Sequence, residues 1–273
     1  MSELAGSVGA GKLLVLHPAF GGDPEGLEAA IGIQRSLARL LERCGRPTAF
    51  ALMRVRVEAL DPGVETEHGA PLSVGDLMLG TVDAWPDDAV APLLGAQLGC
   101  RFGLVLEFHA LGPQFRLDAR LFDNAGEDTP HALAQWSRED DNLRLPTFLF
   151  ELVAEVAART GVACPWPGPS EMFGTDDAIA VLYSLQALGY CTELEEQCRV
   201  HLPHVLHSLT SLVEAAPAFA VAHGVVESTL LALARRGAND LELARWLKEL
   251  RALAGADAWP GLHERLTAAR AQP

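Results

Sequence analysis

The sequence predicts an α/β fold, a mixed sheet with helices, in its amino-terminal part, followed by an all-α arrangement of helical hairpins. Apolar and alternating runs typical of strands occur up to residue 137, whereas every periodic stretch after residue 170 has helical spacing. Between them, CPWPGPS holds three prolines in seven residues, which excludes a regular helix or a central strand. We therefore expect an α/β domain over 1–163, a proline-rich linker over 164–170 and a helical domain over 171–273.

The first predicted elements are a strand, a turn and a helix. Residues 13–16 are all apolar and are followed closely by Pro and Gly, which is typical of a buried central strand. Asp23 is placed to cap a helix that begins at Pro24, and apolar residues then recur at three- and four-residue spacings up to Cys44. Three less regular segments follow: a strand over 48–60, a short strand or an irregular segment over 72–82, and a short helix over 87–98.

The clearest pattern is a β-hairpin. Apolar residues alternate with other residues over 102–109 and 115–122, on either side of a Gly112-Pro113 turn. This alternation predicts one apolar face that packs against the core. A further strand over 131–137 and a helix over 145–158 complete the expected α/β domain.

After the linker, the sequence predicts helices joined by short turns, which favours antiparallel helical hairpins. Thr175 is expected to cap the first helix and Gly189 to end it, and Pro203 is expected to interrupt the second. The predicted helices cover 176–188, 193–216, 218–236, 241–253 and 262–269.

The composition excludes several classes of partner. The net charge is −15 and the isoelectric point is about 4.9, whereas nucleic acids and anionic membranes require clustered Lys and Arg. The amino terminus has neither a basic start nor an apolar core of a signal peptide, so we expect a cytoplasmic protein. Five cysteines without a Cys-x-x-Cys pair indicate free thiols rather than a disulfide framework.

Residues 93–126 and 135–140 carry a resemblance to a known family. A Leu98-Gly99 step leads into the hairpin, the second strand of the hairpin closes with Leu121-Phe122-Asp123, and Trp136-Ser137 marks the next strand. This arrangement resembles the TolB amino-terminal-like domain, also seen in FlgO-type proteins. The opening LLVLHPAFGGDPEG is similar to the first strand and the Gly-Asp-Pro turn of that family.

The helical part carries a second resemblance. The segment TDDAIAVLYSLQALGY, residues 175–190, is similar to the helix that follows this domain where it is fused to tetratricopeptide repeats, and APAFAVAHG, residues 216–224, resembles the opening of such a repeat. The two resemblances together imply a bacterial, non-catalytic adaptor that binds another protein or peptide, with a possible role in signalling or assembly. A homo-oligomer is left open.

The turn HPAFGGDPEG, residues 17–26, lacks both the dinucleotide-binding pattern and the P-loop pattern, and Asp23 and Glu25 would repel an anion. We therefore interpret the turn as the start of a helix. The alternative is a small-ligand sensor or an unrecognised enzyme that uses a crevice at the carboxyl end of the first strand. The residues of that crevice would be His17, Phe20, Gly21 and Gly22.

The sequence offers weak candidates for a metal site in Cys198, His201 and His204, but standard zinc spacings are absent, so we expect neither a metal nor another cofactor. No motif joins a nucleophile to a base, so we expect no enzyme.

The residues proposed to contact a protein partner come from the hairpin and from two turns. Cross-strand pairing is the simpler explanation for the hairpin residues, and loop packing is the simpler one for the tryptophans. The candidates are Glu107, His109, Arg116, Arg120, Trp166 and Trp259.

Overall fold

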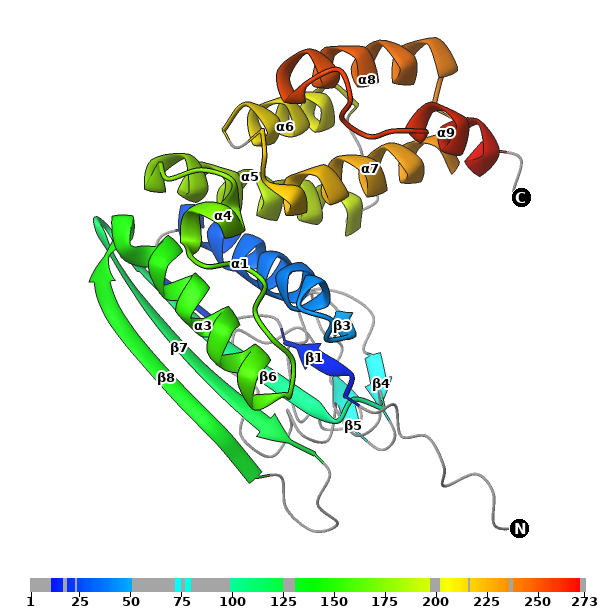
Figure 1. Ribbon diagram of the computed structural model, residues 1–273. Helices are drawn as coiled ribbons and strands as arrows, with labels where there is room; N and C mark the ends of the chain where they lie inside the picture. The colour runs from blue at the N-terminus through cyan, green and yellow to red at the C-terminus, as the bar shows by residue number, and fades with distance from the viewer. Residues whose placement is uncertain are drawn as a thin grey trace, which may run out of the picture.

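The computed structural model describes residues 11–16, 19–22, 24–50, 72–74, 77–79, 99–124, 131–196, 202–215, 217–235 and 238–270. These residues form a mixed sheet covered by helices, so the mixed α/β class is confirmed (Figure 1). The strand order along the sheet is β3 (Thr48–Phe50), β1 (Leu13–Val15), β6 (Phe102–Leu111), β7 (Gln114–Asp123) and β8 (His131–Asp141). β1 runs parallel to β3 and β6, whereas β6, β7 and β8 are antiparallel.

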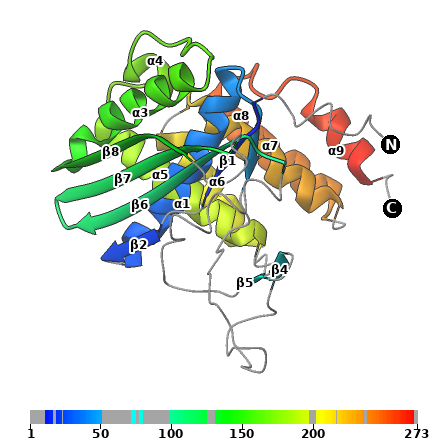
Figure 2. The ribbon, with the colours of Figure 1, turned by 90° about the horizontal axis from the view of Figure 1, so that it is seen from below.

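A short strand, β2 (Ala19–Gly22), lies inside the segment predicted to be only a turn. β1 pairs with the first residues of β6, and β2 continues along the same edge of β6 with the register shifted by one residue. The segment therefore contains a strand that was not predicted, in addition to the expected start of a helix at Pro24. The reason is that β6 extends beyond the end of β1, and its remaining hydrogen-bonding groups are paired by β2 (Figure 2).

The segment that allowed a short strand forms two, β4 (Leu72–Val74) and β5 (Leu77–Leu79), which pair with each other in an antiparallel hairpin. The continuation of the predicted second strand past Phe50 and the predicted helix over 87–98 lie outside the described residues.

The predicted hairpin is confirmed. β6 and β7 pair along their whole length, and Gly112 in the turn has φ of +69°, which a glycine adopts without strain. The alternate residues from Phe102 to Phe108 and from Phe115 to Leu121 are buried on one face, as expected. Their neighbour β8 is longer than predicted and carries Trp136, which packs against the core.

Helices α1 (Pro24–Arg43) and α3 (Leu145–Arg159) cover the apolar face of the sheet (Figure 1). The predicted α1 and α3 are thus confirmed to within two residues of their expected ends. A 3-10 turn over Asn142–Arg144 precedes α3, and the short helix α4 (Pro169–Phe173) follows it after an irregular stretch.

The remaining helices stack on α1 on the side away from the sheet. α5 contacts α1, α6 and α7, while α6 contacts α8 and α7 contacts α9. The described helices of this part are α5 (Ala178–Glu196), α6 (Leu202–Ala215), α7 (Ala220–Arg235), α8 (Asp240–Ala254) and α9 (Leu262–Arg270).

Two expectations about these helices were wrong and one was confirmed. α5 does not end at Gly189 but continues to Glu196. The glycine instead allows a close approach of α1, since a Cβ there would overlap the carbonyl oxygen of Glu28. The expected interruption near Pro203 is confirmed, since α5 ends at Glu196 and α6 begins at Leu202. Pro203 is the second residue of α6, a position where proline removes no intrahelical hydrogen bond. Asp177, not Thr175, caps α5, since its Oδ1 accepts from the backbone nitrogens of Ile179 and Ala180 at 2.9 and 3.3 Å.

The buried apolar side chains form one continuous cluster that extends from the sheet through α1 and α5 to α9. Within the described residues, none of the helices has both the length and the apolar composition needed to cross a membrane.

Candidate functional site

The four hairpin residues predicted to contact a partner lie on the face of the sheet opposite the core. In the β6–β7 register His109 faces Arg116, and Glu107 faces Asp118. However, the side-chain contacts run along each strand: His109 Nε2 lies 2.6 Å from Glu107 Oε1, and Arg116 Nε donates to Asp118 Oδ2 at 2.8 Å. Three of the four side chains, Glu107, His109 and Arg116, are therefore engaged by neighbours on their own strands.

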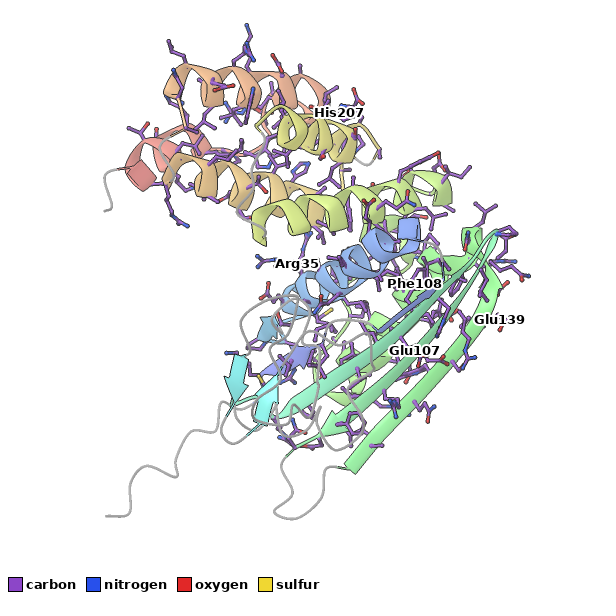
Figure 3. All side chains as sticks on the ribbon, turned by 180° about the vertical axis from the view of Figure 1, so that it is seen from behind. Arg35, Glu107, Phe108, Glu139 and His207 are labelled. Atoms are coloured by element: carbon purple, nitrogen blue, oxygen red, sulfur yellow. The ribbon has the colours of Figure 1, made fainter. Side chains whose placement is uncertain are left out.

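The polar face extends onto β8, where Glu139 is opposite Arg116 and Gln135 is opposite Arg120. Arg120 is half-buried and also has an interaction partner. Figure 3 shows Glu107 and Glu139 on this sheet, well separated from His207 on α6. The polar face and the helical stack are thus distinct surfaces.

The residues predicted to line a crevice at the first strand belong to a segment beside this polar face. Phe20, Gly21 and Gly22 form β2, whose backbone pairs with Phe108, His109 and Ala110 of β6. His17 lies outside the described residues. The pairing brings two groups of predicted residues, far apart in the sequence, to the same part of the sheet.

The two tryptophans are used in packing. Trp259 is only 4% exposed, its Nε1 donates to the carbonyl oxygen of His223 at 2.8 Å, and its ring lies 4.8 Å from that of His223. The indole is therefore engaged in packing within the chain, which was the simpler of the two explanations for this residue. Trp166 is half-buried against the core, with the Arg43 guanidinium 5.6 Å from its ring centre.

The weak metal candidates are not brought to a describable site. Cys198 and His201 lie outside the described residues, and His204 is described only by its backbone in α6. Among the residues that the structure does describe, no group of three His, Cys, Asp or Glu side chains could hold a metal ion.

A groove of about 770 Å³ lies on the surface between α1, α5 and α6. Its most prominent side chains are Ile179 and Tyr183, one helical turn apart on α5, which are 53% and 63% exposed. Large apolar side chains are usually buried, so two adjacent exposed ones in a groove mark a surface suited to contact with another molecule. Small side chains, Ala180, Ala187 and Ala215, form much of the remaining apolar lining.

The polar side chains of the groove are mostly acidic. Glu28 comes from α1, Asp177 precedes α5 and Glu214 lies in the last turn of α6. His207, Ser208 and Ser211 of α6, together with Gln186 of α5, complete the lining. The groove therefore combines an apolar ridge with hydrogen-bonding groups and negative charge.

Reasoning from the sequence missed Ile179 and Tyr183. Apolar residues occur on every side of α5. Val181, Leu185 and Leu188 are buried, whereas Ile179 and Tyr183 are exposed. A helix of this kind normally lies in the centre of a bundle. The apolar residues on all sides of α5 could be recognised in the sequence. The sequence pattern does not show which of these side chains remain exposed.

No protein-family model and no curated protein matches the sequence. The groove and its chemistry are therefore the features from which a function can be inferred.

Proposed function

We propose that the protein is a cytoplasmic, non-catalytic adaptor module, in which the groove between α1, α5 and α6 binds a segment of another protein. In this proposal residues 1–163 form a TolB amino-terminal-like domain, residues 164–170 a linker, and residues 171–273 a tetratricopeptide-like domain. The observation that carries the proposal is the exposure of Ile179 and Tyr183 inside a groove of about 770 Å³.

The arrangement of the helices supports the comparison with tetratricopeptide repeats. α5, α7 and α9 contact one another in succession, and α6 contacts α8, so alternate helices form two layers. Stacked helical pairs of this kind create elongated surfaces that bind extended or helical peptides. The groove lies at the first of these pairs, where it also includes α1 of the preceding domain.

The test is site-specific photo-crosslinking in cells of the source organism. A photoreactive phenylalanine derivative at position 183 should capture a defined protein, because Tyr183 lines the groove and is 63% exposed. The same derivative at Leu241, which is highly exposed on α8 outside the groove, is the matched control. Capture of identical proteins at both positions, or of none at position 183, would contradict the proposal.

The alternative, a small-ligand sensor, has one specific observation in its favour: β2 brings Gly21 next to His109, which is paired with Glu107. Native mass spectrometry of the full chain tests this alternative directly. A retained metabolite that is lost in His109→Ala, while Tyr183→Ala still retains it, would favour the sensor over the adaptor.

A further inference from the structure

The groove between α1, α5 and α6 has a definite charge as well as an apolar ridge. Among its described lining residues, three are carboxylates and none is Lys or Arg. The three, Glu28, Asp177 and Glu214, come from three different segments and line the groove together with Ile179 and Tyr183. An occupant with apolar anchors therefore meets negative charge in the same groove.

Local structure strengthens this negative charge at one end. Glu214 is exposed in the last turn of α6. The helix dipole is also negative at this end, so α6 does not stabilise the carboxylate of Glu214. Asp177, by contrast, caps α5 through Oδ1. A cation from a partner placed near Glu214 would be attracted by both the carboxylate and the helix terminus.

The shape of the groove favours a helical occupant. Its walls are helices, so a partner finds no strand edge there with which to form a sheet. Ile179 and Tyr183 are four residues apart and lie on the same face of α5. The apolar residues on one face of a second helix have the same spacing and can pack against them. Alanines on α5 and α6 allow the backbone of another helix to come close.

We propose that the groove binds an amphipathic helical segment that carries Lys or Arg beside its apolar face. This inference rests on the proposed adaptor function and names the chemistry of the partner. A second copy of this chain is a poor occupant, because each copy has a net charge of −15 and would bring repulsion to an acidic groove. The occupant is therefore a segment of a different, basic protein.

The experiment uses the full chain and three fluorescent 18-residue peptides. The first has leucine at helical spacing and lysine at the remaining positions, the second replaces lysine with glutamate, and the third keeps lysine but replaces leucine with serine. Fluorescence anisotropy should detect binding of the first peptide only. Its affinity should fall when sodium chloride is raised from about 50 to about 300 mM, because exposed ion pairs are screened by salt.

Variants locate the binding. Asp177→Asn combined with Glu214→Gln keeps a capping side chain and should weaken the lysine–leucine peptide about five- to tenfold, as expected for two exposed ion pairs. Glu242→Gln with Asp257→Asn removes the same charge outside the groove and should change binding less than twofold. Tyr183→Ser should weaken binding by at least about tenfold, because it removes the apolar anchor.

Equal binding of the glutamate peptide, or equal weakening by the two double variants, would overturn the inference. Failure of all three peptides would overturn it too. In either case a protein captured at position 183 but not at position 241 would leave the adaptor function standing, so the two proposals fail separately.

Discussion

Arg46 connects three parts of the fold although it is only 8% exposed. One terminal nitrogen donates to the carbonyl oxygen of Gly11 at 2.6 Å, the other donates to that of Thr160, and the guanidinium lies 5.3 Å from the ring centre of Phe102. Burial, followed by the nearby charge of Arg101, lowers the pKa of Arg46. The guanidinium has thus lost most of its contact with water, and hydrogen bonds to backbone carbonyl groups compensate for the lost hydration.

Replacing this arginine should destabilise the protein more than replacing an exposed one. Arg46→Met keeps most of the stem but leaves two buried carbonyl groups without their donor, so the free energy of unfolding should fall by about 2–4 kcal/mol. Arg245→Met is the control, because Arg245 is exposed and makes only an i,i+4 pair with Glu249, with an expected loss below about 0.5 kcal/mol. Urea denaturation followed by circular dichroism measures both, and similar losses would contradict the argument.

Cys44 at the end of α1 should make stability depend on alkaline pH. Burial, and then the neighbouring Cys164 thiol, raises the pKa of Cys44 from 9.0 to about 12. Between these values the native state keeps a proton that the unfolded state releases, so the free energy of unfolding decreases as pH rises above 9, by at most about 1.4 kcal/mol per pH unit. Cys44→Ala should show a shallower decrease than the wild type in urea titrations at pH 8, 9 and 10. Parallel pH profiles would show that Cys44 makes no such contribution.

At the scale of elements, the packing of α1 on α5 depends on two glycines. A Cβ on Gly32 would overlap the carbonyl oxygen of Leu185, and one on Gly189 would overlap that of Glu28. Both substitutions to alanine should therefore lower the free energy of unfolding by at least about 2 kcal/mol, although alanine is the better helix former. Gly224→Ala on α7 is the matched control, since its Cβ would meet nothing within 4 Å and the change should stabilise by about 0.5–1 kcal/mol. Equal effects at all three sites, measured by urea denaturation, would mean that the helices do not approach closely.

The elements that could be predicted are those whose signal is local. Alternation predicted β6 and β7, and capping and proline signals predicted the start of α1 at Pro24. Local rules failed at Gly189, which resembles a helix terminator but accommodates another helix, and at β2, which exists because a longer partner strand offers it an edge. Both failures come from tertiary contacts with residues that are far away in the sequence.

At the scale of the whole molecule, the same reasoning explains why the groove was not foreseen. It is assembled from Glu28 of α1 and from residues of α5 and α6 that follow it by about 150 residues or more. The candidates were chosen from the sequence because Trp, His and charged side chains often contact partners. In the structure, however, Trp259 is buried and His109 is paired with Glu107. Function here depends on which apolar side chains stay uncovered, and that is decided by how whole elements stack.

The continuous core predicts that the two halves of the chain unfold together. α5 packs against α1 across the proline-rich stretch, and Trp166 within that stretch contacts Arg43 of α1. Calorimetry of the full chain should therefore give one transition whose calorimetric and van't Hoff enthalpies agree. A chain ending at residue 163 loses the helix that covers Gly32, so its melting temperature should fall by more than about 10 °C and it should bind a dye for exposed apolar surface. If the shortened chain instead keeps its melting temperature and the full chain melts in two steps, the α1–α5 contact adds little to stability. The groove would then lie between independently folded units, and its shape would vary with their relative movement.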